Sequence, residues 1–175
     1  MSTRSLEDRL RDVEDRLEIL NLVAAHPPGA DTGATEYIRT AWTEDGSFDL
    51  GSDKDIKGRE NIAAHVRTPA HLAAIENGIG HFAGLPHIAI KGDTAIVTSY
   101  LQILVPQTQG DPVTIANHGT SKGYRVHRLG TNRWTLVRTP DGWKIKSRVS
   151  RPVGTEEARQ ILRQGLEPAS GGRTG

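Results

Sequence analysis

The start of the chain carries the hydrophobic spacing of an amphipathic helix. Its apolar residues recur every three or four positions, at Leu6, Leu10, Val13, Leu17, Leu20 and Leu22 or Val23, which is the spacing of one helix face. Ser5 and Asp8 have the separation of a capping box, in which each side chain binds an amide that the helix leaves unpaired. Because Pro27 and Pro28 cannot continue a helix, we expect this one to end at His26.

The opposite face of this helix is charged, with Glu7, Arg11, Glu14 and Glu18. Such a face is compatible with two arrangements. One is a coiled coil, in which a second helix covers the apolar stripe. The other is a short amphipathic helix packed on its own domain. We favour the second, because the segment has few turns before the two prolines.

Residues 32–77 alternate between helical and turn patterns. We expect a second helix over 32–42, with Tyr37, Ile38 and Ala41 or Trp42 turned inward, and a turn at 44–46. A short strand over 47–50 and a polar hairpin loop over 53–58 come next. Residues 58–77 are again helical in pattern, and Pro69 interrupts them because a proline ring clashes with a helix interior.

After Gly80 the pattern changes to that of β-strands. Runs rich in β-branched and aromatic residues predict strands over 81–91, 94–106, 113–129, 133–138 and 143–153, with turns at 91–93 and 139–142 and a loop at 107–112. A short helix follows over 155–166. The segment 107–129 is long enough to act as a lid or as an interface arm, and the sequence does not separate these roles.

This order of elements indicates one α+β domain. Helices come first and antiparallel strands follow, over residues 1–166, and the Gly-rich residues 167–175 predict a disordered C-terminal tail. A long curved antiparallel sheet wrapped around N-terminal helices encloses a conical cavity, which is a natural ligand pocket.

Composition narrows the classes of function. The chain has 175 residues and no Cys, so it builds its core without disulfides and has neither a thiolate zinc site nor a cysteine nucleophile. The lack of Cys suits a reducing compartment, and we expect a cytoplasmic protein. The 22 Lys and Arg balance 21 Asp and Glu, which leaves no electrostatic footprint for nucleic acid. The charged start and the short apolar runs predict neither a secretory signal nor a membrane span.

Several segments, taken in order, carry a family resemblance. They are Asp15–Leu22 with Gly29–Asp31, Trp42–Phe48, Lys57–Ile62, His81–Phe82, Gly92–Ala95, and Asn132–Trp134 leading to Arg138–Ile145. In this order and spacing the chain resembles the SnoaL-like family of the nuclear transport factor two superfamily. The resemblance implies a cone-shaped α+β barrel. It leaves the function open, because the family is functionally mixed.

That family includes scytalone dehydratase, a bile-acid dehydratase, hexachlorocyclohexane dehydrochlorinase, polyketide cyclases and structural small subunits of dioxygenases. Its dehydratase-like members use an Asp–His pair, and the matching positions here are Asp31 and His81. The resemblance implies that His81 removes a proton while Asp31 fixes the tautomer of its ring. Without the resemblance, Asp31 is a good N-cap for the second helix, and His81 is an ordinary histidine of an edge strand.

Two more positions match polar groups of family pockets. His26 stands where relatives place a Tyr or Lys that assists the leaving group, and Arg148 matches a cation that stabilises developing negative charge. Alternatively, His26 is a partly exposed residue at a helix end, and Arg148 is one more surface cation.

Aromatic residues are the candidate walls of the pocket. The candidates are Trp42, Phe48, Phe82, Tyr100 and Trp134. We expect Trp42 and Trp143 to serve the core, and Phe48 and Tyr100 to face the pocket. The other histidines, His65, His71, His87, His118 and His127, lack the spacing of a zinc motif, so we expect no metal site. A phosphate loop and a nucleophile elbow are also missing.

These observations favour a cofactor-independent lyase or isomerase of the dehydratase or elimination type. Its substrate would be a small hydrophobic cyclic molecule, and we expect no cofactor, nucleic acid or membrane as a partner. Two alternatives remain: a non-catalytic ligand-binding or assembly subunit, and an epoxide hydrolase or polyketide cyclase-like enzyme. The face of an open sheet needs cover, which predicts a homodimer or homotrimer.

Overall fold

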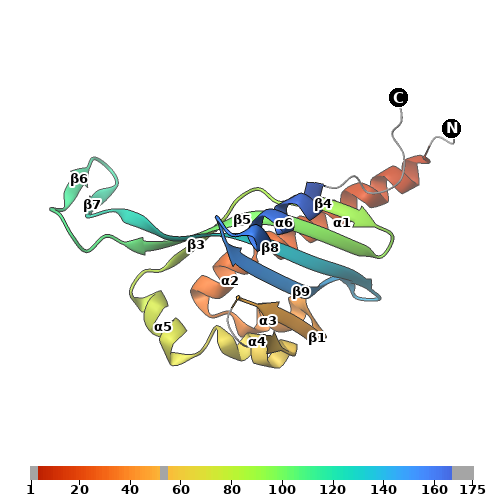
Figure 1. Ribbon diagram of the computed structural model, residues 1–175, viewed down its shortest axis with the longest axis horizontal. Helices are drawn as coiled ribbons and strands as arrows, with labels where there is room; N and C mark the ends of the chain where they lie inside the picture. Colours follow the sequence, from red (N-terminus) through yellow and green to blue (C-terminus); the bar gives the residue numbers. More distant parts are fainter. Residues whose placement is uncertain (1–3, 52–54, 167–175) are drawn as a thin grey trace.

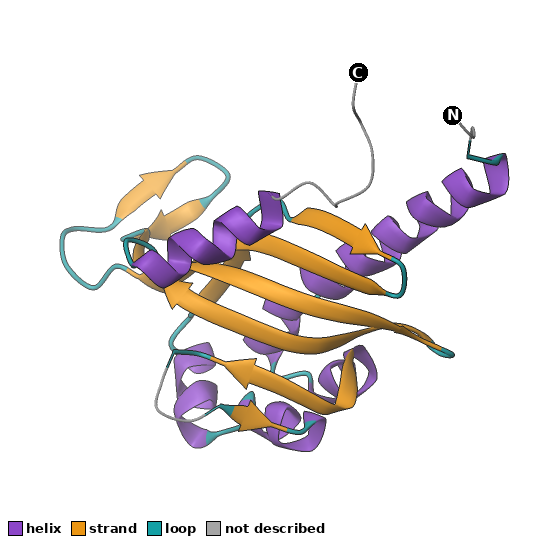
Figure 2. Cartoon of the chain, turned by 45° about the vertical axis from the view of Figure 1, so that its right-hand side comes forward, coloured by secondary structure: helices purple, strands orange, loops and turns teal. Residues whose placement is uncertain are grey.

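An open curved sheet forms the centre of the molecule (Figure 1). The computed structural model describes residues 4–51 and 55–166. The N-terminal helices are α1 (Leu6–Ala24), α2 (His26–Thr32), α3 (Thr35–Ala41), α4 (Arg59–His65) and α5 (Pro69–Glu76). Helix α6 (Glu156–Leu166) packs on the opposite face of the sheet, in front of the strands in Figure 2. The expected tail, residues 167–175, lies outside the described residues.

Seven strands form the sheet in the order β2-β1-β9-β8-β5-β3, and β4 also pairs with β5. Their bounds are β1 (Trp42–Asp49), β2 (Ile56–Lys57), β3 (Gly80–Ala83), β4 (His87–Lys91), β5 (Thr94–Pro106), β8 (Tyr124–Thr139) and β9 (Gly142–Pro152). A separate hairpin of β6 (Val113–Ile115) and β7 (Gly119–Ser121) projects beyond them. The predicted α+β class and curved sheet are confirmed, and over the described ranges the sheet stays open rather than closing into a barrel.

One strand pair corrects the expectation of an antiparallel sheet. Strand β1 pairs with β9 in parallel, with Phe48 opposite Arg148. Parallel strands need a long crossover connection, and the helices and strands between β1 and β9, which are nearly a hundred residues apart in the chain, provide it. This register brings an aromatic ring of the first strand beside a cation of the last.

Several helix boundaries in the structure agree with those predicted from the sequence. The capping box is confirmed, since Ser5 Oγ accepts from the Asp8 amide at 3.0 Å and Asp8 Oδ2 accepts from the Ser5 amide at 3.3 Å. The prolines end α1 but begin α2, because the first turn of a helix does not need their missing N–H groups. The break at Pro69 is also confirmed.

Three strand expectations are wrong in their limits. Strand β1 begins at Trp42, through the expected turn at 44–46. The expected strand 81–91 divides into β3 and β4 around Gly84–Pro86. Most of the expected strand 113–129 is the β6–β7 hairpin followed by the start of β8. The 53–58 loop expectation falls partly on residues 52–54, which lie outside the described residues.

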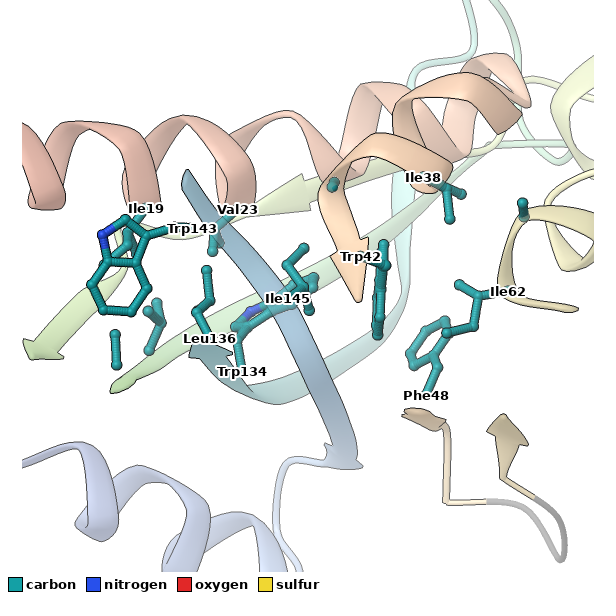
Figure 3. Close-up of a cluster of buried hydrophobic side chains, with 14 of the residues drawn as sticks. Ile19, Val23, Ile38, Trp42, Phe48, Ile62, Trp134, Leu136, Trp143 and Ile145 are labelled. Carbon is teal, nitrogen blue, oxygen red and sulfur yellow. The ribbon is translucent and has the colours of Figure 1, made fainter. Parts of the chain in front are cut away.

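The hydrophobic core lies between the helices and the inner face of the sheet. Figure 3 shows Ile19 and Val23 of α1 facing Trp143 and Leu136 of the sheet. Trp42, Trp134 and Trp143 are the largest fully buried side chains, so the core positions expected for Trp42 and Trp143 are confirmed. None of the helices in the described part of the chain is long and apolar enough to cross a membrane.

Candidate active site

Asp31 and His81 form a bidentate pair between α2 and β3. His81 donates its backbone N–H to Asp31 Oδ2 at 2.9 Å, and its ring Nδ1 lies 2.5 Å from Asp31 Oδ1. A carboxylate accepts hydrogen bonds, so Nδ1 is the nitrogen that carries a proton toward Asp31. The two contacts hold the ring in one orientation. The contact leaves Nε2 as the ring nitrogen that does not face Asp31.

Helix α2 positions Asp31, and this corrects the N-cap alternative. The N-cap of α3 is Ala34, which makes no side-chain capping bond. Gly33 ends α2 in a left-handed conformation (φ 62°) that favours glycine. A Cβ on Gly29 would lie 2.7 Å from the Tyr37 ring, so the glycine permits the close packing of α2 on α3. Asp31 is thereby held at the end of α2 beside β3.

A cavity of about 110 Å³ opens beside this pair. Its lining residues are His26, Ala30, Phe48, Leu50, His65, Val66, His71, His81, Leu101, Ile103, Arg128, Gly130, Arg148 and Ser150. Three of the four candidate polar residues, His26, His81 and Arg148, line the cavity. The fourth, Asp31, contacts His81. The lining described here contains cations and histidines but no carboxylate.

Only one of the five aromatic candidates lines the cavity, namely Phe48. Phe82 and Tyr100 are 61% and 49% exposed, on the outer side of the sheet. Successive side chains of a strand alternate between faces, so Phe82 faces away when its neighbour His81 faces in. Trp42 and Trp134 are buried behind the lining. The fold therefore places neither Phe82 nor Tyr100 in the cavity, contrary to the prediction.

Arg148 is a buried cation held by neutral groups. Its side chain is 4% exposed and lies between the rings of Phe48 and Trp134, each 4.5 Å from the guanidinium carbon. Its Nε and Nη2 donate to Asn132 Oδ1 at 3.2 and 3.0 Å. No carboxylate pairs with it within residues 4–51 and 55–166. The alternative of a surface position is excluded.

Burial determines the charge states of Arg148 and His26. It lowers the pKa of Arg148 to about 9, so the guanidinium keeps its charge at pH 7. Burial, followed by the charge of Arg148, holds the pKa of His26 well below its usual range. His26 Nε2 accepts from Arg148 Nη1 at 2.5 Å, which places the ring proton on Nδ1. His26 is thus a buried neutral imidazole, not the exposed helix-end residue of the alternative.

His65 and His71 are cavity residues that the sequence did not reveal. The His71 ring lies 6.3 Å from both His65 and His81, measured between ring centroids. His71 Nε2 donates to the carbonyl of Ala30 at 2.9 Å, next to Asp31 in the chain. Burial and the nearby His71 lower the pKa of His65. Their six-residue spacing in the sequence does not indicate that they lie together, because they belong to two helices, α4 and α5, whose arrangement depends on the break at Pro69.

The metal hypothesis has no geometric support among these histidines. Within the residues that the structure describes, no group of three or more His, Asp or Glu side chains could hold a metal ion. His71 and His81 direct one nitrogen each toward a protein oxygen.

Comparison with known proteins places this geometry in a family. A sequence profile of the SnoaL-like domain matches residues 11–149. The chain belongs to the SnoaL-like family. A nuclear transport factor 2-like protein of cystatin-like fold from Novosphingobium aromaticivorans is 32% identical, with a TM-score of 0.80, over 92% of this chain and 99% of that one. The resemblance predicted from the sequence motifs is confirmed.

More distant structures share the fold of this SnoaL-like chain. A proposed dehydratase of the nuclear transport factor 2-like family from Streptomyces avermitilis is 22% identical (TM-score 0.58; 81% of this chain, 98% of that one). The hexachlorocyclohexane dehydrochlorinase LinA-type3 from Novosphingobium barchaimii is 15% identical (TM-score 0.64; 85% and 91%). No curated protein matches the chain.

Proposed function

We propose that this SnoaL-like protein is a cofactor-independent lyase that eliminates a proton and a leaving group from a small, largely apolar cyclic substrate. The observation that carries the proposal is the 2.5 Å contact between Asp31 and His81, with His81 on the cavity wall. A neutral imidazole oriented by a carboxylate is a suitable base near pH 7. The dehydratase and dehydrochlorinase among the structural neighbours support the reaction class.

The proposed step balances without a further reactant. His81 Nε2 removes a proton from carbon beside an electron-withdrawing group, and the C–H electrons form the new C=C bond. The bond to the leaving group on the next carbon breaks, and its electrons depart with that group. A departing hydroxide takes the proton back from His81 and leaves as water. A departing halide leaves as the anion, and His81 then releases its proton to solvent.

Arg148 and Asp31 supply the electrostatics of this step. Asp31 stabilises the imidazolium that His81 becomes. Arg148 lines the same cavity, and no carboxylate among residues 4–51 and 55–166 pairs with it, so its charge can stabilise the leaving group or an enolate oxygen. His26 shares its Nε2 with Arg148 and orients the guanidinium. The absence of a carboxylate from the described lining favours neutral or anionic substrates.

The alternative functions receive less support from the geometry. A non-catalytic subunit predicts a filled cavity and no contact within the Asp31–His81 pair, and the structure has both the cavity and the contact. The family resemblance implies that an epoxide hydrolase of this fold would use two Asp side chains around an arginine. The described cavity lining holds Arg148 and no Asp or Glu.

The test is turnover of a panel of cyclic β-hydroxy ketones and halogenated cycloalkanes. New C=C absorbance and released halide report elimination. We expect the unmodified protein to convert at least one compound, and His81→Gln or Asp31→Asn to lower kcat by about 10²–10⁴-fold. Arg148→Met should lower kcat by a larger factor than it raises the substrate Kd, because the guanidinium stabilises mainly the negative charge that develops in the transition state.

Phe82→Ala is the matched control, since Phe82 neighbours His81 in β3 but faces outward. It should keep full turnover. Thermal unfolding of every variant checks that the fold survives. Compounds that bind in the cavity but are never converted, with unchanged binding in His81→Gln, would favour the non-catalytic subunit instead.

A further inference from the structure

The first turns of α1 stand free of the rest of the chain. Leu6, Leu10, Val13 and Leu17 are 77%, 56%, 51% and 55% exposed, which contradicts the expectation that the apolar stripe packs on its own domain. Figure 1 shows this end of α1, in red, extending past the edge of the sheet. A helix exposed on nearly all sides is marginally stable alone in water. Burial of its exposed leucines against a partner surface would therefore stabilise it.

The exposed stripe has the spacing of a coiled-coil seam. Leu6, Leu10, Val13, Leu17, Leu20 and Ala24 are separated by four, three, four, three and four residues. This is an unbroken heptad pattern with an apolar residue at each first (a) and fourth (d) position. A helix that packs on a globular core has a wider apolar face. The narrow seam fits one other helix lying alongside.

The body of the protein contacts the back of this helix and leaves the seam free. Asp15 binds Arg138, Glu18 accepts from the Trp143 amide, and Ile19 is fully buried. In the heptad frame these residues occupy positions f, b and c, which lie opposite the a and d seam. The body also contacts one flank of the seam, where Arg16 at a g position donates to the carbonyl of Ile88 at 3.0 Å. The seam side chains from Leu6 to Leu17 stay exposed, so a partner helix can reach them.

Charges beside the seam specify a second copy in parallel orientation. The positions on one side (e) hold Glu7 and Glu14, and those on the other (g) hold Arg9 and Arg16. A parallel dimer places each g residue beside the e residue five positions further on the partner, which pairs Arg9 with Glu14 twice. An antiparallel dimer would place like charges together. Neither Arg9 nor Glu14 forms an ion pair within the described part of this chain.

An apolar groove continues the seam at its C-terminal end. Leu20, Ala24, Phe82 and Leu85 help to line it, and the Leu85 side chain is almost fully exposed. The seam and the groove together form one apolar surface along α1. We propose that α1 pairs with α1 of a second copy of this chain as a parallel two-stranded coiled coil over residues 6–20.

The mass of the full chain in solution tests the proposal. Light scattering coupled to gel filtration should give twice the 19.0 kDa of one chain, or a higher state that depends on the seam. Leu10→Glu should lower that mass, because it puts two carboxylates in the seam. Arg11→Glu adds the same side chain at a back position of the helix and should keep the mass. A monomer, or a mass that Leu10→Glu leaves unchanged, overturns the proposal.

Charge reversal tests the orientation without removing apolar contacts. Arg9→Glu or Glu14→Arg alone should raise the Kd of the dimer about tenfold, since each variant opposes like charges in two symmetric pairs. The double variant should restore the Kd. A single reversal that leaves association unchanged or tightens it contradicts the parallel arrangement. Circular dichroism confirms that each variant folds.

Cross-linking gives an independent measurement of register. The chain has no Cys, so a Leu6→Cys variant carries one thiol, and a parallel dimer places it beside its own copy. Mild oxidation should yield a covalent dimer from Leu6→Cys and not from Arg11→Cys, whose thiol faces away from the seam. Equal yields from both variants would indicate random collision and overturn the proposal.

Discussion

Arg148 and His26 share one buried hydrogen bond, and their charges differ because of what surrounds them. Arg148 has the carbonyl oxygen of Asn132 and two aromatic faces, which stabilise a cation without neutralising it. His26 has a cation on one nitrogen, while its Nδ1 has no partner among the described atoms. Protonation of His26 would place two buried positive charges in contact.

The low pKa of His26 makes folding sensitive to mild acid. In the unfolded chain a histidine titrates near its ordinary pKa of ~6.5, and in the folded protein the pKa of His26 lies well below that value. The stabilisation is therefore complete above the unfolded pKa and is lost as pH falls from there toward the folded pKa. His65, whose pKa is lowered in the same direction, adds to the effect.

Urea unfolding between pH 7.5 and 5.5 measures this loss. The free energy of unfolding should fall by at most about 1.4 kcal/mol per pH unit for each histidine below the unfolded pKa. His26→Gln should flatten the slope, whatever its effect on total stability. His87→Gln, at an exposed position of β4, should leave the slope unchanged. Equal slopes in the His26→Gln variant and the unmodified protein would contradict the prediction.

The Asp15 carboxylate is the centre of a hydrogen-bond cluster that joins helix α1 to the sheet. Asp15 accepts two hydrogen bonds from Arg138 at 2.6 Å each and one from Trp143 Nε1 at 2.9 Å. The hydrogen bonds from Arg138 and then Trp143 lower the pKa of Asp15. Arg138 also lies over the Trp143 ring at 4.6 Å. This contact joins the first helix to the β8–β9 hairpin across 123 residues of sequence.

Removal of the Asp15 carboxylate should weaken this junction. Asp15→Ala should lower the free energy of unfolding by about 2 kcal/mol, because three hydrogen bonds to a charged group are lost while Arg138 stays partly hydrated. Asp12→Ala is the matched control, since Asp12 pairs only with the exposed Arg16 within the described residues, and it should cost less than about 1 kcal/mol. Both values come from urea unfolding at neutral pH and one protein concentration. Equal losses would contradict the anchoring role.

The molecule divides into a packed body and a projecting arm. Every residue of the segment 107–127 is exposed, and the β6–β7 hairpin at its end pairs only with itself within the described residues. The arm extends away from the cavity-bearing body in Figure 1. Of the two roles that the sequence left open, the exposed position favours an interface arm over a lid. The stability of the body should therefore not depend on the arm.

Deletion of the arm tests this separation. A variant in which Asn-Gly replaces residues 108–122 keeps the pairing of Gln107 with Gly123. Its free energy of unfolding should change by less than about 1 kcal/mol, because the removed surface is exposed and a shorter loop closes at lower entropic cost. Val113→Ser with Ile115→Ser, at full length, separates apolar contacts from loop length. A large loss of stability in either variant would mean that the arm is packed in solution.

The sequence by itself determined the local features of this protein. The capping box, the helix break at Pro69 and the start of the last helix depend on residues within about four positions of one another, so their physics is present in any short stretch. The burial of Trp42 and Trp143 was predictable because aromatic residues make up only 5% of the chain and large aromatic side chains usually fill cores. The family was predictable because its motifs occur in the expected order and spacing. The pair Asp31 and His81 was found through the motif order.

Only the tertiary structure decided which side chains face the cavity. His65 and His71 reach it because α4 and α5 fold around Pro69, and Phe82 and Tyr100 miss it because strand register sets the face of each residue. A shift of one residue in register exchanges the two faces of a strand, and both faces of β3 and β5 carry apolar or aromatic residues, so their local pattern does not report that choice. The parallel pairing of β1 with β9, which sets Phe48 beside Arg148, likewise depends on contacts a hundred residues apart.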